Sequence, residues 1–175
     1  MKIVVLKFGG TSVGTIEKIK KVTDIIIEHK KKRNKVIVVS SAMSGVTNDL
    51  IKKSKQISNN FIDSEYDVLV SSGEQVACSL IAGRLNHKGF KSRSWLGWQI
   101  PIFTNGPYTN SRIQQVNKNK LLRFLKEGGI PIITGFQGVN MNERVTTIGR
   151  GGSDASAIMI AKSFKIGRAS CRERV

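Results

Sequence analysis

The chain has 175 residues, a length typical of a single domain. Hydrophobic residues make up 39% of it, and 17 glycines stand against 3 prolines, which excludes the disordered and fibrous classes. No apolar run approaches the roughly 20 residues of a membrane helix, and the N-terminal segment lacks the features of a signal peptide. Cys78 and Cys171 lie far apart without metal-ligand spacing, so we expect a cytoplasmic protein without a disulfide.

The formal net charge is +17, and the basic residues are densest between Lys30 and Lys35. Such a cluster fits either a nucleic-acid surface or the solvated end of a helix, where cations complement the helix dipole. The basic residues are not interleaved with aromatic side chains, and the chain carries no nucleic-acid-binding motif. We therefore expect neither a nucleic-acid nor a membrane partner, with a non-catalytic basic binding module as the alternative.

Apolar runs and glycine-marked turns alternate along the chain in the pattern of strands followed by helices. Near-continuous apolar strands separated by helices favour a mostly parallel sheet covered on both faces. We therefore predict an α/β fold, a three-layer αβα sandwich with a mostly parallel central sheet. In chain order, the predicted elements are a strand at 2–8, a helix at 16–27, a strand at 35–40, a helix opening at 50–51, a helix from about 73 to 86, strands at 92–96 and 100–104, a helix at 116–126, a strand at 130–134, a hairpin around 144–148 and a helix at 153–162.

Residues 166–175 do not continue this pattern, because they combine three arginines with no amphipathic period. One possible back-translation of these residues resembles a common sequencing adapter read as coding DNA. We predict that native sequence ends near Lys165 and that 166–175 is a non-native, adapter-derived tail. A genuine basic tail is the alternative.

Three clusters of glycine and polar residues, at 9–12, 40–48 and 135–138, directly follow predicted strands, which places them at one rim of the sheet. In the first cluster Lys7 precedes paired glycines, and the N–H groups of such a turn bind anions. A plain strand-to-helix turn is the alternative, and the order of lysine and glycines excludes a Walker A loop. The hydroxyls of the second cluster could hold carboxylate or phosphate oxygens, or cap the following helix.

Two further motifs place charges near predicted helix starts. In Ser71–Glu74 the glutamate is either a capping residue or a counter-charge for an ammonium group. The run Gly149–Asp154 is the least ordinary, because its glycines cost backbone entropy that a plain turn does not require. Arg150 suits bidentate binding of a carboxylate or phosphate, and Asp154 is either part of a site or a favourable acid in the first helical turn.

Together these motifs resemble the aspartate kinase branch of the amino-acid kinase family, over Met1 to about Lys165. The resemblance implies transfer of the ATP γ-phosphoryl group to the β-carboxylate of L-aspartate, with Mg²⁺ on the nucleotide, as the first step toward lysine, threonine and methionine. A sibling kinase with another carboxylate substrate remains the alternative. The motifs that match in the family's order are Lys-Phe-Gly-Gly-Thr-Ser, Ser-Gly-Val-Thr-Asn, Ser-Ser-Gly-Glu, Gly-Phe-Gln-Gly and Gly-Arg-Gly-Gly-Ser-Asp.

The resemblance also implies a role for each motif residue. The aspartate carboxylate, with a reference pKa of about 3.9, is ionised at neutral pH, so catalysis should rest on positioning and charge neutralisation rather than on a general base. Lys7 and Asp154 are the expected catalytic residues, and no residue is assigned as a metal ligand. Expected ATP contacts are Lys7, Phe8, Gly9 and Gly10, and expected aspartate contacts are Ser41, Thr47, Glu74, Phe136, Arg150 and Ser153.

Chains of this family continue well beyond this length and supply further strands, the adenine pocket and C-terminal regulatory domains. By this resemblance we expect residues 1–165 to be the N-terminal part of an amino-acid kinase catalytic domain, incomplete at its C-terminus and inactive alone. We expect the full-length form to be a homo-oligomer.

Overall fold

The computed structural model describes residues 2–149, 151–166 and 170–172, the last three as backbone only. Sheet A is parallel throughout and has the strand order β3-β6-β2-β1-β9. Its strands are β1 (Ile3–Phe8), β2 (Lys35–Ser40), β3 (Ser92–Trp95), β6 (Ile130–Thr134) and β9 (Ser170–Arg172). The strand β9 lies inside the predicted tail and pairs with β1, and the origin of that tail stays a prediction.

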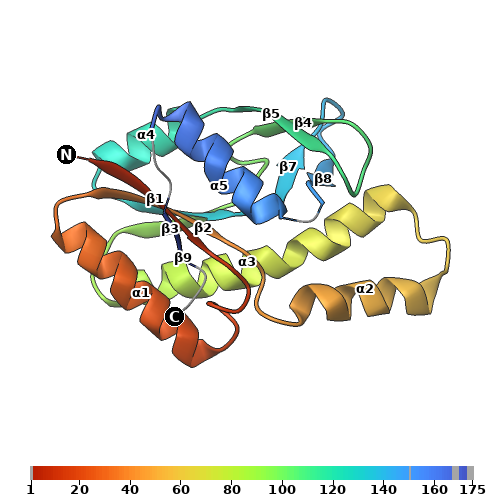
Figure 1. The fold of residues 1–175 in the computed structure, drawn as a ribbon, viewed down its shortest axis with the longest axis horizontal. Coiled ribbons are helices and arrows are strands. Elements are labelled where there is room, and N and C mark those ends of the chain that lie inside the picture. The colour runs from red at the N-terminus through yellow and green to blue at the C-terminus, as the bar shows by residue number, and fades with distance from the viewer. Residues whose placement is uncertain (1, 150, 167–169, 173–175) are drawn as a thin grey trace.

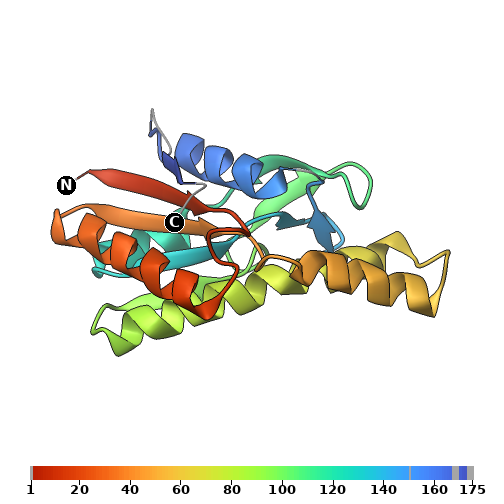
Figure 2. The same ribbon diagram turned by 60° about the horizontal axis from the view of Figure 1, so that its bottom comes forward.

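Helices cover both faces of sheet A, which confirms the predicted three-layer arrangement (Figures 1 and 2). On one face lie α1 (Ile16–Lys31) and α3 (Asp63–His87), and on the other α4 (Asn119–Lys126) and α5 (Gly152–Ser163). Successive side chains of a strand point to opposite faces, so Leu6 and Phe8 enter the core under α1 and α3. Val5 enters the core under α4 and α5, which explains why β1 carries apolar residues toward both faces, with Lys7 as the exception.

A second, smaller sheet was not predicted. Sheet B has the order β5-β4-β7-β8, with antiparallel pairs at both ends and a parallel pair between β4 and β7. The prediction of one helix over 116–126 was wrong in its first turn, because β5 extends to Val116 and α4 starts at Asn119. Only the last of the five residues of β5 is buried, so its sequence lacks an apolar run. The strands of sheet B are β4 (Ile102–Asn105), β5 (Arg112–Val116), β7 (Gln137–Val139) and β8 (Val145–Thr147).

Two helix starts differ from prediction. The helix α2 (Val46–Ile57) begins four residues before Leu50, and α3 begins at Asp63 rather than near Gly73. Gly73 therefore lies inside α3, where a Cβ atom would stand 2.9 Å from Cβ of Ala42. The glycine lets α3 approach the segment after β2, so it serves helix packing and not helix initiation.

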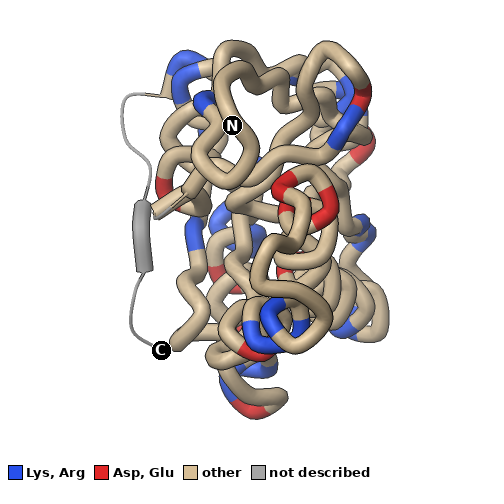
Figure 3. The backbone as a smooth tube through the Cα atoms, turned by 90° about the vertical axis from the view of Figure 1, so that its right-hand side faces the viewer, with Lys and Arg blue, Asp and Glu red and all other residues tan. Residues whose placement is uncertain are grey.

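The charged residues are distributed over several elements, with acidic residues among the basic ones (Figure 3). The basic cluster at Lys30–Lys35 begins in the last turn of α1, as expected, and Lys30 Nζ donates a 2.9 Å hydrogen bond to the carbonyl oxygen of Gly128. Within the described part of the chain, no helix is long and apolar enough to cross a membrane.

Candidate functional site

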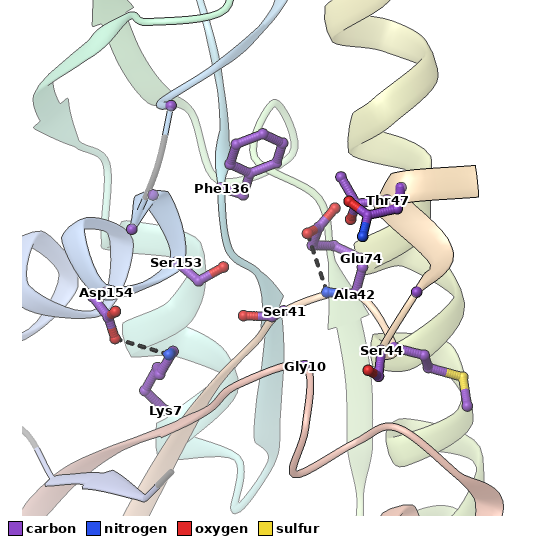
Figure 4. Close-up of a pocket in the computed structure, with 16 residues that line it drawn as sticks. Lys7, Gly10, Ser41, Ala42, Ser44, Thr47, Glu74, Phe136, Ser153 and Asp154 are labelled. Atoms are coloured by element: carbon purple, nitrogen blue, oxygen red, sulfur yellow. Dashed lines mark hydrogen bonds and ion pairs between the residues drawn. The ribbon is translucent and has the colours of Figure 1, made fainter. Parts of the chain in front are cut away.

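A cavity of about 330 Å³ lies at the carboxyl ends of β1, β2 and β6, between α3 and the start of α5 (Figure 4). The three clusters predicted to share a rim of the sheet contribute Gly10, Ser41 and Phe136 to its wall, which confirms that they meet. Eight predicted site residues line the cavity: Lys7, Gly10, Ser41, Thr47, Glu74, Phe136, Ser153 and Asp154.

At one end of the cavity, Lys7 of β1 forms an ion pair with Asp154 from the first turn of α5. The Nζ–Oδ1 distance is 2.9 Å, and Lys7 is buried with 7% of its surface exposed. The turn that follows passes close to the segment after β2, because a Cβ on Gly10 would stand 3.0 Å from the carbonyl oxygen of Ala42. The cavity wall therefore combines a buried ammonium group from β1 with the glycine turn that follows this strand.

Three predicted site residues lie elsewhere or outside the described chain. The side chain of Phe8 is fully buried in the core of sheet A, so only its backbone is available to a ligand. Its carbonyl oxygen already accepts a hydrogen bond from the Ser41 N–H at 3.0 Å. Gly9 lies next to the Lys7 ammonium group, because a Cβ on it would lie 3.4 Å from Nζ, but it is not among the residues that line the cavity. Arg150 lies outside the described residues.

On the α3 side of the cavity, Glu74 offers an acceptor. It is 3% exposed, and its Oε1 accepts a 3.1 Å hydrogen bond from the Ala42 N–H. Its Oε2 has no hydrogen-bond partner among the described residues. Burial raises the pKa of Glu74 from 4.5 to about 7, while the Ala42 N–H opposes that shift. Because Glu74 sits in the middle of α3, the capping interpretation is wrong, and the buried carboxylate is suited to a cationic group.

Two helices direct uncapped N-termini at the cavity. The N-cap residues of α2 and α5 are Gly45 and Gly151, with φ of 85° and 72°, and neither has a side-chain capping bond. The alternative interpretation of the second cluster, in which the Ser44 or Thr47 hydroxyl caps the following helix, is therefore wrong for α2. Helix N-termini carry partial positive charge, so both ends favour an anionic ligand.

Close packing explains the glycines around α5. A Cβ on Gly135 would stand 2.6 Å from Ser153 Oγ, and one on Gly152 would stand 2.8 Å from the Phe136 ring. Phe136 itself adopts φ of 66°, and its N–H donates to Ser156 Oγ at 3.2 Å. The loop after β6 and the start of α5 therefore form one compact wall, which fixes the position of the ion pair behind it.

Sequence reasoning missed Asp67, a fully buried carboxylate on α3. Its oxygens accept hydrogen bonds from the N–H of Thr109 at 3.0 Å, and from the N–H and hydroxyl of Thr147 at 2.8 and 2.7 Å. Asp67 thereby ties β8, which precedes the glycine run at the cavity, to α3. Its spacing of seven residues from Glu74 places both on one face of the helix.

Replacing Asp67 with alanine is expected to lower the free energy of unfolding by about 3 kcal/mol or more, because it strands buried donors. The matched control is Asp49→Ala on α2, an exposed residue whose ion pair with Lys52 spans 3.7 Å, and the expected change there is below about 1 kcal/mol. Urea denaturation measures both. Equal losses would contradict the anchoring role of Asp67.

Comparison with known proteins shows the family and close relatives. The model of the amino acid kinase family matches residues 2–169. The chain is 47% identical over 165 residues to the aspartokinase of Geobacillus stearothermophilus and 45% identical over 171 residues to that of Rickettsia conorii. These matches cover 94% and 96% of this chain but only 40% and 43% of the relatives.

Solved structures agree on the fold. The aspartate kinase from Synechocystis superposes with a TM-score of 0.84 at 35% identity, covering 100% of this chain and 29% of that one. E. coli aspartokinase III in complex with aspartate and ADP has a TM-score of 0.86 at 24% identity, covering 99% of this chain and 49% of that one. The latter likeness shows the fold alone. With the family model spanning nearly the whole sequence and the matching motifs gathered around one cavity, this chain belongs to the amino acid kinase family.

Proposed function

We propose that this chain carries the aspartate-binding part of an aspartate kinase, which transfers the γ-phosphoryl group of ATP to the β-carboxylate of L-aspartate and forms 4-phospho-L-aspartate. One observation carries the proposal: a single cavity joins the open carboxylate oxygen of Glu74 to the Lys7–Asp154 pair. An amino acid with a carboxylate side chain has one ammonium group, which suits the Glu74 carboxylate, and two carboxylates, which suit a wall that contains a cation. The aspartokinases among the relatives support this substrate.

The chemistry requires two anions to approach each other, namely the β-carboxylate and the terminal phosphate. Lys7 would contact the transferring phosphoryl group and neutralise its charge, and Asp154 would orient the Lys7 ammonium group through the 2.9 Å ion pair. Glu74 would bind the substrate ammonium group. The remaining proposed contacts are Arg150 with the α-carboxylate, hydroxyls from Ser41, Thr47 and Ser153, and Phe136 as a wall.

ATP would enter beside the turn at Gly9 and Gly10, whose backbone would cradle phosphate oxygens. Mg²⁺ would arrive on the ATP phosphates and supply charge neutralisation there. Among the described residues no group of three His, Cys, Asp or Glu side chains could hold a metal, and a metal held mainly by phosphates and water needs few protein ligands. A place in lysine, threonine and methionine biosynthesis, a cytoplasmic location and a homo-oligomeric full-length form belong to the same proposal.

Calorimetric titration at pH 8 tests the substrate. We expect L-aspartate to bind at least about tenfold more tightly than L-glutamate or N-acetyl-L-glutamate, because one extra methylene is poorly accommodated in a formed pocket. The exposed Glu65 on α3, which pairs with Arg144, offers a control variant, Glu65→Gln, that should bind aspartate normally. Tighter binding of either competitor would assign a sibling kinase. Salt-dependent binding of unrelated DNA without amino-acid binding would favour the basic module.

A further inference from the structure

A second cavity lies between α4 and the segment that follows β3. Its volume is about 490 Å³, larger than that of the candidate active site, and the two cavities share no lining residue. Its wall combines three cationic side chains with three aromatic rings. The cations are Arg93, Lys120 and Arg123, and the rings belong to Trp95, Trp98 and Phe124. We propose that this cavity binds a planar aromatic anion of the size of a nucleoside monophosphate.

The charge of the wall favours an anion. Glu127 is the single acidic residue in the lining, and its carboxylate is already held by Lys91 Nζ at 2.6 Å. Within the described part of the chain, Arg93 and Arg123 form no ion pair with a carboxylate. The Lys91 ammonium group and, more weakly, the Arg123 guanidinium lower the pKa of the Glu127 carboxyl. The cations of the wall still outnumber this one carboxylate, and arginine binds phosphate or carboxylate oxygens in bidentate geometry.

The aromatic part of the wall is packed at one end and open at the other. The rings of Trp95 and Phe124 meet edge to face with centroids 5.7 Å apart, and the Arg93 guanidinium stacks 4.2 Å from the Trp95 ring. Trp98 is 51% exposed, which leaves part of a large aromatic side chain open to contact with a ligand. Lys91, which lies outside the lining, places its Nζ 5.5 Å from the Phe124 ring centroid, so a second ring of the wall also packs against a cation.

One unsatisfied donor adds to this chemistry. The indole Nε1 of Trp95 is buried and has no hydrogen-bond partner among the described residues. A buried donor without a partner is destabilising, and Trp95 belongs to the cavity wall. A ring nitrogen or oxygen of a ligand that reached Nε1 would satisfy it. The cavity volume falls within the range of about 300–1,000 Å³ that small-molecule sites occupy. An inorganic anion would leave the rings unused, and an uncharged ring would leave the cations unused.

The chain contains only two tryptophans, and both line this cavity, so intrinsic tryptophan fluorescence reports on this site alone. AMP is the probe, with adenosine, inorganic phosphate and a single-stranded oligo(dA) as comparisons. We expect AMP to quench the fluorescence saturably, with an affinity at least about tenfold higher than adenosine or phosphate, because each lacks one of the two contacts. Saturating L-aspartate should leave the titration unchanged, so this result does not depend on the proposed function.

Two variants on α4 make the test specific. Arg123→Gln is expected to weaken AMP binding about tenfold through the loss of one charge-assisted contact. Lys126→Gln, an exposed residue on the same helix outside the lining, should leave it unchanged. Absence of saturable quenching by AMP up to about 10 mM, or equal effects of both variants, would overturn the proposal. Oligo(dA) binding far more tightly than AMP would also overturn it, in favour of a nucleic-acid surface.

Discussion

Replacement of Lys7 with alanine is expected to slow phosphoryl transfer by about 10³-fold or more while L-aspartate binding changes less than about tenfold. Lys7 is the cation that the structure buries at the cavity wall, with its ammonium group 2.9 Å from the Asp154 carboxylate. In a site with little water, a fixed positive charge stabilises the charge that develops on the transferring phosphoryl group. Among the described residues that line the cavity, Lys7 is the only cation, so no other side chain there can replace its charge.

Phosphoryl transfer is measured in an active form of the protein, either the chain itself or the chain extended after Lys165 by the C-terminal part of the Geobacillus relative. Lys7→Met provides a second variant, which keeps most of the side-chain volume and separates loss of charge from a packing defect. Lys20→Ala, at an exposed position of α1, is the matched control and should retain full activity. Substantial turnover by both Lys7 variants would remove Lys7 from the mechanism.

The parts of the site that follow strands could be predicted from the sequence. The apolar runs of β1, β2 and β6 are unambiguous, and each is followed at once by glycine or hydroxyl residues. Parallel strands place their carboxyl ends at one edge, so the meeting of Lys7, Ser41 and Phe136 follows from strand order alone. For these three strands, the local sequence pattern was therefore enough to predict that residues far apart in the chain meet.

The features that were missed depend on contacts between distant segments. In the sequence, Gly73 is typical of a helix start. Its close contact with Ala42 explains why a glycine stands inside α3 instead, where Glu74 is a buried acid in the middle of the helix. Asp67 carries no motif, because its partners Thr109 and Thr147 lie 42 and 80 residues away in sequence. The strand β5 lacks an apolar run and exists through its pairing with β4. Such tertiary contacts override local propensity.

Replacement of Glu74 with glutamine is expected to weaken L-aspartate binding about 100-fold and yet stabilise the free protein above neutral pH. The affinity loss is expected because the variant removes the buried counter-charge that we propose for the substrate ammonium group. The pKa of Glu74 rises from 4.5 to about 7 on folding, so the ionised form is the one that burial disfavours. The destabilisation is therefore absent below about pH 4.5, grows as the pH rises toward 7, and is complete above it. Glutamine stays neutral and avoids it.

Urea denaturation at pH 5 and pH 8 separates this effect from ordinary packing changes. The stability difference between Glu74→Gln and the unchanged protein should shift in favour of the variant by about 2 kcal/mol between those pH values. Glu65→Gln, at an exposed position of the same helix, should show no such shift.

In the unchanged protein, aspartate affinity should fall about tenfold per pH unit below pH 7, because binding then requires the release of a proton. If the aspartate affinities of Glu74→Gln and the unchanged protein depended on pH in the same way, Glu74 would not be the group that releases a proton on binding. A carboxylate that lowers stability when charged, and that binds its ligand only in the charged form, would be explained by function and not by folding.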